Sequence, residues 1–511
     1  MLTSHRLVRS VITRAHSCSK PLSTVATLPR IAVCGSGPSA FYSIKYLLDK
    51  HPDVHIDIIE KLPTPFGLVR YGVAPDHPDV KSVVTQFAEI AENKRVQYFG
   101  NVVLGKDVEL SQLLSSYSAV VLGIGATSDR KLGISGEVEV DERADPATGT
   151  LSSGGLLSAR SFVHWYNGHP EFAWVKAVLQ ALPHPLRDVV IVGHGNVAID
   201  CARIMTESLS ELQHTDIVTD ALEVIRGCGI ERVHLLGRRG HVQAAFTIKE
   251  LRELSKLAEC RLVIRRDELD AGMTDASRDE LAASRPRKRI TDLVENICKG
   301  TAPGVEGIKK QEIHLRFLVS PTDITSSEGW VSGVKTVRNS LVGGAGGQAA
   351  VATAEEELLP AQLLLRSVGY KSEPVPGLEP EFFDDRRAVV CNQRGRVTST
   401  ASDATVKTGL YVTGWLKRGP SGIIGTNIAD AKETVESVLT DLESGMIAPV
   451  PASGGDISPL RELLAPDVNV VDWAGFRRID AEETRRGQVA GKLREKITDV
   501  CELLAVAGRC R

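Results

Sequence analysis

The chain has 511 residues, of which 42% are apolar, 5% aromatic and 24% charged, and its formal net charge is −3. This length suggests about two to four domains, and the ordinary composition excludes disordered, collagen-like and disulfide-scaffold proteins. No stretch approaches the roughly 18 apolar residues of a membrane span. The near-zero net charge argues against bulk nucleic-acid binding.

The N-terminal segment differs in composition from the rest of the chain. No acidic residue occurs before Asp49, and Arg6, Arg9 and Arg14 lie among many serines and threonines. Arg-rich, Ser-rich and acid-poor segments are typical of organellar transit peptides. We therefore predict that residues 1–29 are a mitochondrial transit peptide outside the fold; the alternative is a disordered basic tail.

Two units of the chain share one pattern, a short apolar strand, a glycine turn and a helix. Residues 31–34 lead into the first turn and residues 189–192 lead into the second. Each unit has a second predicted strand, at 54–59 and 233–236, and further short strands are predicted at 119–122, 363–365 and 410–412. Strands that alternate with helices predict parallel α/β sheets.

The first unit has the form of a dinucleotide-binding turn. Gly35 and Gly37 suit a tight turn and a close backbone approach to a pyrophosphate at a helix N-terminus, and Ala40 takes the third small position. Glu60 follows the second strand, twenty residues after Ala40, where a carboxylate accepts hydrogen bonds from ribose hydroxyls. The alternative is a glycine-rich turn without a ligand.

The second unit ends its second strand differently. Gly193, Gly195 and Ala198 repeat the turn, but Arg238 and Arg239 replace the acid. Guanidinium groups bind a 2′-phosphate, which a carboxylate would repel. The pair predicts NADPH in this unit and FAD in the first, unless the arginines are only solvated surface residues.

The cysteines carry no recognisable redox or metal pattern. The nine cysteines are never closer than nine residues, so zinc-ribbon, ferredoxin-like and thioredoxin-like spacings are absent. Cys34 and Cys201 lie in apolar segments and are expected to be small buried side chains. Electrons are therefore not expected to be carried by thiols of this chain.

Several longer motifs resemble the adrenodoxin reductase family of NADPH–ferredoxin reductases. The most specific are PFGLVRYGVAPDHP at 65–78 and GWLKRGPSG at 414–422, accompanied by GSGPSAFY at 35–42, GNVAID at 195–200, GRRG at 237–240 and SVGYKS at 367–372. The resemblance implies an α/β fold with two Rossmann-like dinucleotide-binding domains, the NADP domain inserted into the FAD domain. It assigns 30–128 and 368–511, with C-terminal helices, to FAD binding and 129–367 to NADPH binding. Asp480 and Glu483 have the spacing of a capping box in those helices.

The resemblance also assigns roles to residues. FAD would contact one group of residues: Gly35, Gly37, Ser39, Ala40, Glu60, Leu68, Leu104, Trp415, Gly422, Ile423 and Ile424. NADPH would contact a second: His194, Gly195, Asn196 and Val197, with Arg238, Arg239 and Glu250 near its 2′-phosphate ribose and Gly422 near the nicotinamide. His77 and Asp200 resemble a buried catalytic pair near the flavin. His194 departs from the glutamine that is common in the family, and Ser39–Ala40 from the common Ala–Gly.

The implied reaction is hydride transfer from NADPH to FAD, followed by single-electron transfers to an acidic [2Fe-2S] ferredoxin of the adrenodoxin type. The matching partner-binding residues are Arg252, Arg285 and Arg289, with Lys417 and Arg418 as further basic candidates nearer the flavin. The expected location is the mitochondrial matrix, with association at the inner membrane left open.

Three other functions stay open at this point. The first is an NADPH-dependent flavin reductase of quinones or another small acceptor. The second is a non-catalytic NADP(H)-binding regulator, and the third is an electron-feeding module of a larger synthase. The third would be expected to carry cysteine clusters for iron–sulfur centres.

Overall fold

The computed structural model describes residues 27–137, 154–301, 310–400, 404–451 and 458–509. Residues 1–26 of the predicted transit peptide lie outside these ranges. Within residues 27–29, strand β1 (Thr27–Leu28) pairs with β22 (Val450–Pro451), so this end of the segment takes part in the fold, contrary to our expectation.

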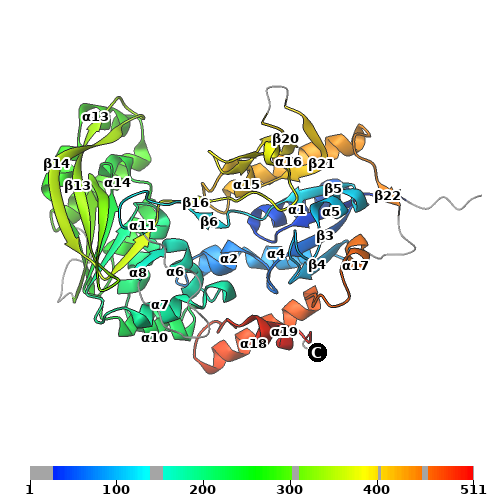
Figure 1. Ribbon diagram of the computed structural model, residues 1–511, viewed down its shortest axis with the longest axis horizontal. Helices are drawn as coiled ribbons and strands as arrows, with labels where there is room; N and C mark the ends of the chain where they lie inside the picture. The colour runs from blue at the N-terminus through cyan, green and yellow to red at the C-terminus, as the bar shows by residue number, and fades with distance from the viewer. Residues whose placement is uncertain (1–26, 138–153, 302–309, 401–403, 452–457, 510–511) are drawn as a thin grey trace, which may run out of the picture.

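The molecule has two lobes, each built on its own sheet (Figure 1). The N/C lobe, made from both ends of the chain, has a seven-stranded sheet in the order β19-β20-β21-β5-β2-β3-β4. Its strands are β2 (Arg30–Cys34), β3 (His55–Glu60), β4 (Val96–Gly100), β5 (Ala119–Leu122), β19 (Asn392–Gln393), β20 (Arg396–Thr398) and β21 (Val406–Val412). Five of them are parallel, and β20 and β19 add an antiparallel edge.

The inserted lobe, made from the middle of the chain, has a six-stranded parallel sheet in the order β10-β11-β9-β8-β15-β7. Its strands are β7 (Leu156–Ser158), β8 (Asp188–Val192), β9 (Arg232–Gly237), β10 (Cys260–Ile264), β11 (Gln311–Phe317) and β15 (Leu363–Arg366). All the strands that we predicted from apolar runs are therefore present in one of the two sheets.

Burial on both faces explains why these strands read as continuous apolar runs. In β2, Ile31 and Val33 pack into one core, and Ala32 and Cys34 pack into another on the opposite face of the sheet. The strand β8 alternates in the same way between two cores of the inserted lobe. Cys34 is 1% exposed, as predicted for a small buried residue.

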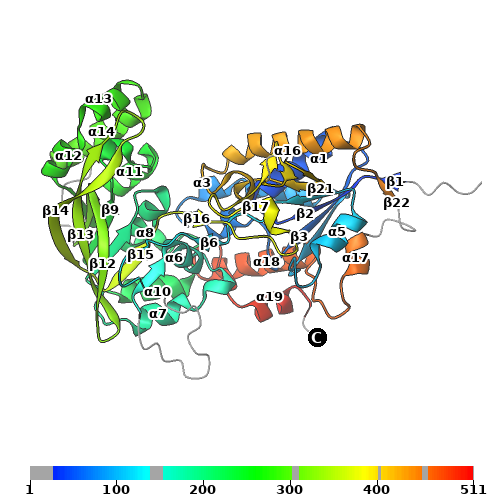
Figure 2. The ribbon, with the colours of Figure 1, turned by 45° about the horizontal axis from the view of Figure 1, so that its top comes forward.

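The chain crosses between the lobes at β6 (Ser128–Asp129) and β16 (Tyr370–Lys371), which pair with each other (Figure 2). After the second crossing, β21 returns to the first sheet and pairs with β5. These connections confirm the predicted α/β fold, with one parallel-sheet lobe inserted into the other. The boundaries that we assigned from the sequence stay predictions.

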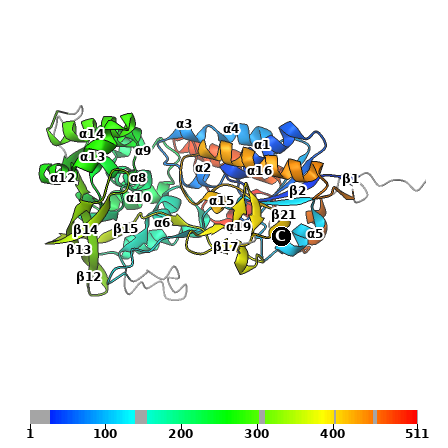
Figure 3. The same ribbon diagram turned by 90° about the horizontal axis from the view of Figure 1, so that it is seen from above.

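Helices cover both sheets (Figure 3). Those of the N/C lobe are α1 (Pro38–Lys50), α2 (Leu68–Tyr71), α3 (Pro78–Lys81), α4 (Val84–Ala91), α5 (Leu110–Ser116), α15 (Trp415–Arg418), α16 (Thr426–Glu443), α17 (Pro459–Leu463), α18 (Trp473–Val489) and α19 (Val500–Val506). Those of the inserted lobe are α6 (Ala159–Tyr166), α7 (Val175–Ala181), α8 (Asn196–Thr206), α9 (Leu209–Leu212), α10 (Thr219–Gly227), α11 (Ile248–Ser255), α12 (Arg266–Gly272), α13 (Asp275–Ala282) and α14 (Arg285–Cys298). None of the helices in the described part of the chain is long and apolar enough to cross a membrane.

Two features differ from the sequence expectations. Asp480 and Glu483 lie inside α18, whose N-cap is Asp472, so the predicted capping box is wrong. Three antiparallel strands of the inserted lobe were not predicted: β12 (Val319–Ser327), β13 (Trp330–Val342) and β14 (Ala349–Pro360). β14 is mostly exposed, so its sequence lacks the continuous apolar run of a buried parallel strand.

Candidate functional site

The first glycine turn follows β2, at the point where neighbouring strands β3 and β5 diverge to either side. Gly35 has a φ of 102°, and a Cβ there would lie 2.5 Å from the carbonyl oxygen of Gly123. Gly37 is the N-cap of α1, and a Cβ built on it would meet nothing within 4 Å. The helix N-terminus therefore opens onto free space.

Glu60 lies beside this turn at the end of β3, as predicted. Its Oε2 accepts hydrogen bonds from the backbone N of Ser36 at 3.0 Å and from Ser36 Oγ at 2.6 Å. Its Oε1 accepts a hydrogen bond from the backbone N of Leu62 at 3.0 Å. Burial raises the pKa of Glu60. The three donors fix the carboxylate against the glycine turn.

Residues that follow β21, far along the chain, lie against the first glycine turn. Gly414 follows β21 with a φ of 72°, and a Cβ at this position would collide with the side chain of Ser39. Asp430 accepts a hydrogen bond from the backbone N of Gly414 at 2.5 Å. Trp415 is partly buried, and its ring lies 5.4 Å from that of Tyr370, beside the interlobe crossing.

The other predicted FAD contacts lie around this region of the N/C lobe. Leu68 begins α2, directly after Gly67, whose Cβ would lie 3.2 Å from the Cα of Gly37. Leu104 is partly buried and packs against the core on one face of the sheet. Gly422 has a φ of 84°, Ile423 is 68% exposed and Ile424 is partly buried, all just before α16. Ala40 is buried in α1.

The second glycine turn has the same construction in the inserted lobe. Gly193 follows β8 with a φ of 137°, and a Cβ there would collide with the carbonyl oxygen of Ser367. Gly195 is the N-cap of α8, and a Cβ built on it would again meet nothing within 4 Å. Asn196 Oδ1 accepts a hydrogen bond from the backbone N of Thr247 at 2.9 Å, and Val197 is partly buried next to it.

His194 points into the protein interior. Its Nε2 lies 3.0 Å from the carbonyl oxygen of Leu235, and its ring packs edge-on against Phe317 at 5.0 Å. Burial lowers the pKa of His194 to about 4, so the side chain is neutral near pH 7. The His194 ring therefore packs against β9 and Phe317 on the inner side of the turn and adds no charge to the turn.

Arg238 and Arg239 follow β9 with exposed side chains. The carbonyl of Arg238 accepts a hydrogen bond from Asn339 Nδ2 at 2.9 Å, and that of Arg239 accepts one from the backbone N of Leu318 at 3.1 Å. The unpredicted antiparallel sheet therefore fixes the backbone of this turn and leaves both guanidinium groups accessible.

Glu250 lies in a polar cluster where the two lobes meet, together with His77, Glu253 and Asp200. One ligand-type atom from each of His77, Glu250 and Glu253 lies within 4.8 Å of the others. His77 Nε2 lies 2.8 Å from Glu253 Oε2, and Asp200 Oδ1 accepts a hydrogen bond from Arg203 at 2.5 Å. Burial and the charges of Glu250 and Glu253 raise the pKa of Asp200.

His77 is thus hydrogen-bonded to Glu253, and its pairing with Asp200 beside the flavin, which the resemblance implies, stays a prediction. Arg203 also forms an ion pair with Asp76 from the N/C lobe. We did not predict Asp76, Arg203 or Glu253. The spacing of Glu250 and Glu253 places them on one helix face and could have indicated a shared site. Nothing in the sequence indicated that His77 of the other lobe would be their partner.

The two turns fit the pyrophosphates of two dinucleotides. Neither α1 nor α8 has a side-chain N-cap hydrogen bond or an acidic residue in its first turn. Backbone N–H groups at the two glycine turns are therefore available to an anion, and the helix dipole favours one there.

The predicted partner arginines lie together on the inserted lobe. Arg252 is on α11, Arg285 and Arg289 are on α14, and these helices pack against each other. All three side chains are exposed. Lys417 does not belong to this surface, contrary to our expectation, because it is 7% exposed and forms ion pairs with Asp430 and Glu433.

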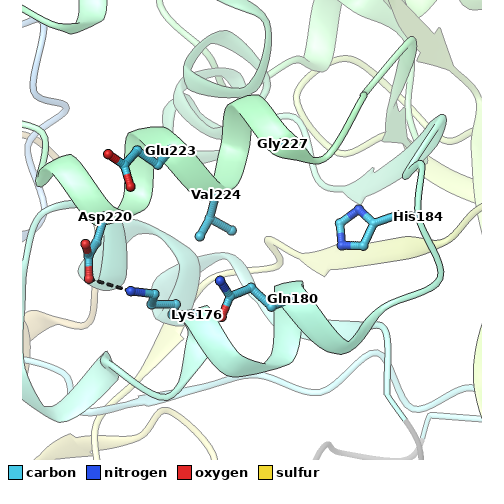
Figure 4. Close-up of a pocket in the computed structure, with 7 residues that line it drawn as sticks. All are labelled: Lys176, Gln180, His184, Asp220, Glu223, Val224 and Gly227. Atoms are coloured by element: carbon cyan, nitrogen blue, oxygen red, sulfur yellow. Dashed lines mark hydrogen bonds and ion pairs between the residues drawn. The ribbon is translucent and has the colours of Figure 1, made fainter.

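A separate hollow lies between α7 and α10 (Figure 4). It is lined by Lys176, Gln180, His184, Asp220, Glu223, Val224 and Gly227. Lys176 Nζ and Asp220 Oδ2 form an exposed ion pair at 2.6 Å across it. None of the predicted site residues lines this hollow, so it is not part of the candidate site.

Two mainly parallel sheets with two open glycine turns, one beside an acid and one beside paired arginines, are typical of an oxidoreductase that binds two dinucleotides. No protein-family model matches the chain. The chain is 42% identical to the mitochondrial NADPH:adrenodoxin oxidoreductase of Arabidopsis thaliana, with 99% of each protein covered. It is 40% identical to the protein of the same name from Homo sapiens, covering 95% of this chain and 93% of that protein.

A solved structure shows the same likeness. The structure of Mycobacterium tuberculosis FprA in complex with NADPH matches with a TM-score of 0.80 and 39% identity, covering 94% of this chain and 99% of that one. The chain belongs to the NADPH:adrenodoxin oxidoreductase family. This membership confirms the predicted class of enzyme, an NADPH-dependent flavoprotein reductase with FAD and NADP(H) as cofactors.

Proposed function

We propose that this enzyme carries electrons from NADPH through FAD to an acidic [2Fe-2S] ferredoxin in the mitochondrial matrix. The observation that carries the proposal is the contrast between the two strand ends. Glu60 is fixed by three donors at the first turn, whereas two exposed arginines follow β9 at the second. The contrast supports FAD in the N/C lobe and NADPH in the inserted lobe.

FAD, when bound, accepts two electrons from NADPH and returns them one at a time. The residues of this chain hold and orient the two dinucleotides. In our proposal the N–H groups of the two glycine turns bind the pyrophosphates, Glu60 binds a ribose and Arg238 and Arg239 bind the 2′-phosphate. Gly414 lies so close to Ser39 at the start of α1 that a side chain there would collide with it, whereas the surroundings of Gly37 are open.

The cluster at the meeting point of the lobes supports a role in proton control. Asp200, whose pKa is raised, lies close to Glu250 and Glu253, and His77 is hydrogen-bonded to Glu253. In our proposal His77 and Asp200 hold a proton beside the bound cofactors.

The acceptor and the location rest on separate support. The exposed arginines of α11 and α14 form a surface of the sign that suits an acidic partner. Relatives are named mitochondrial adrenodoxin oxidoreductases, and the relative from Mycobacterium tuberculosis is named an NADPH-ferredoxin reductase. The acid-poor N-terminal segment agrees with import into mitochondria.

The test is an anaerobic titration of the purified flavoprotein with NADPH, followed by addition of a mitochondrial-type [2Fe-2S] ferredoxin. We expect flavin absorbance to bleach and the ferredoxin then to be reduced. NADH should bleach the flavin much less efficiently than NADPH. The double variant Arg238→Ala with Arg239→Ala should reduce this preference for NADPH over NADH by about tenfold or more. Efficient reduction of a quinone with no reduction of ferredoxin would overturn the proposed acceptor.

A further inference from the structure

Asp216, in the loop between α9 and α10 of the inserted lobe, is held by two lysines from the N/C lobe. Lys81 Nζ lies 2.6 Å from Asp216 Oδ1, and Lys496 Nζ lies 2.8 Å from Asp216 Oδ2. Lys496 also donates to the carbonyl oxygen of Asp216 at 3.2 Å. The Lys496 side chain is 1% exposed and the other two are at most 13% exposed. Both carboxylate oxygens are therefore ion-paired across the interface.

Neighbouring contacts hold the same loop from the same side. Lys492 donates to the carbonyl oxygen of Ile217, and Glu495 accepts hydrogen bonds from Thr219 Oγ1 at 2.7 Å and Thr219 N at 3.1 Å. Figure 1 shows α18, which precedes this segment, running below the N/C lobe toward α10. The segment after α18 thus contacts residues 216–219 of the inserted lobe through Lys492, Glu495 and Lys496.

Each lysine is anchored in its own lobe. Glu483 of α18 fixes the C-terminal segment to the N/C lobe, because it forms ion pairs with Arg70 at 2.6 Å and with Arg494 at 3.0 Å. Lys81 ends α3, and Figure 3 shows this helix at the junction of the lobes, near α9. The lysines therefore project from fixed positions.

The same short segment leads directly to the candidate site. Residues 76–81 contact the inserted lobe at both ends, through Asp76 and His77 at one end and Lys81 at the other. Asp76 pairs with Arg203 of α8, and the N-terminus of α8 is the second glycine turn. The Asp76–Arg203 pair and the contacts of Asp216 therefore set where the second glycine turn, which we assign to the NADPH pyrophosphate, lies relative to the N/C lobe.

Stability alone is a weak reason for such an arrangement. A buried ion pair often contributes no more to folding than well-packed apolar side chains would, because both charges must leave water. In some proteins buried charges specify one geometry over others, since a misaligned pair leaves an uncompensated charge. An interface between two nucleotide-binding lobes is a place where one geometry is required.

We propose that Lys81, Asp216 and Lys496 form an interlobe clamp that holds the NADPH lobe at the distance and angle needed for hydride transfer. The three are positioning residues, and their assignment rests on the proposed function. The clamp acts on the transfer step, because the residues that we assign to the pyrophosphates and to the 2′-phosphate lie within single lobes.

The test compares Asp216→Asn and Lys81→Met with the control Asp220→Asn, which removes a carboxylate from the exposed Lys176 pair four residues further along (Figure 4). Stopped-flow bleaching of the flavin at saturating NADPH should slow about tenfold or more in both clamp variants. The Asp220→Asn control should keep the wild-type rate, and the double variant Lys81→Met with Asp216→Asn should lose less than the product of the single effects. Flavin content and NADP⁺ affinity should stay within about twofold of wild type in all of them.

Hydrogen–deuterium exchange separates the clamp from the proposed function. We expect faster amide exchange in residues 76–81 and 490–498 of the clamp variants, with unchanged exchange in β2 and β8. Wild-type bleaching rates in both clamp variants, or slowing that only matches a loss of flavin, would overturn the clamp. If NADPH failed to bleach the wild-type flavin, the proposed function would fall, and the exchange data would still test the clamp geometry.

Discussion

Single residues at the two turns are constrained by space as much as by chemistry. Gly35, Gly193 and Gly414 all have positive φ, and a side chain on any of them would enter space held by a neighbouring backbone or by Ser39. Gly37 and Gly195 have ordinary φ and open surroundings, so their role is access to the helix N-terminus. The same motif thus contains glycines that are needed for two different reasons.

We predict that Gly414→Ala destabilises the holoenzyme and lowers its flavin content. Positive φ costs an alanine about 1–2 kcal/mol, and the new Cβ collides with Ser39. Gly445→Ala is the matched control, because Gly445 has a φ of 74° and nothing within 4 Å of its Cβ position. Thermal unfolding and the flavin-to-protein absorbance ratio measure both effects.

Adding Ser39→Gly to Gly414→Ala should restore the part of the loss that comes from the collision and leave the part that comes from φ. Equal losses in Gly414→Ala and Gly445→Ala would show that the contact with Ser39 is unimportant.

We predict that His194→Gln makes the protein more resistant to acid. Burial lowers the pKa of His194 from 6.5 to about 4, so the unfolded chain binds a proton that the folded protein does not as pH falls through this range. The wild type therefore loses stability below about pH 6.5, and the variant lacks this loss. As the pH is lowered from about 7.5 to about 5, the free energy of unfolding of His194→Gln minus that of wild type should increase by about 2 kcal/mol.

Chemical denaturation at the two pH values checks this, with the exposed His214→Gln as the control. A constant difference between His194→Gln and wild type across this range would contradict the lowered pKa of His194.

At the level of whole elements, the sequence was most informative where a strand is buried on both faces. The apolar runs that became β2, β5 and β8 need only local composition to be recognised. The strand β14 carries glutamates and is mostly exposed, so its pairing with β13 could not be inferred from its own residues. The role of Glu483 in α18 could not be predicted for the same reason. Its carboxylate accepts hydrogen bonds from Arg70 and from the backbone N of Ile497, which lie in other segments of the chain.

The candidate site divides in the same way. The positions of Glu60, Arg238 and Arg239 follow from one strand–turn–helix unit each, so local spacing was sufficient to predict them. The contact between His77 and Glu253 joins residues 176 positions apart, and nothing local to either residue indicates the other. The contacts of His77 with Glu253 and of Asp76 with Arg203 are therefore the part of the site that the sequence did not predict.

We predict that Glu483→Gln destabilises the protein by about 3–5 kcal/mol, because it leaves the buried Arg70 guanidinium without its counter-charge. Glu483 is 0% exposed and Arg70 is 6% exposed. Its neighbour Glu482→Gln is the control, since Glu482 pairs with Arg485 and Arg486 on the surface of the same helix. Denaturant unfolding of the two variants should separate them clearly, and similar losses would contradict the buried pair.

At the scale of the whole molecule, charge is distributed unevenly although the total is only −3. The inserted lobe presents Arg252, Arg285 and Arg289 on two packed helices, and carboxylates elsewhere balance them in the sum. Association with an acidic partner depends on the local field, which extends about 8 Å at physiological ionic strength. The net charge therefore says little about which surface a partner meets.

We predict that Arg285→Glu and Arg289→Glu each weaken binding of an acidic ferredoxin by about tenfold or more at low salt, with a smaller effect at high salt. Flavin bleaching by NADPH, which does not involve this surface, should keep its wild-type rate. Arg226→Glu on α10 is the control, because it changes the net charge by the same amount at an exposed position on a different helix. Titration of ferredoxin reduction rates against ionic strength measures all three variants. An equal loss in Arg226→Glu would mean that overall charge governs the association, and salt-independent reduction by the wild type would mean that the partner binds another surface.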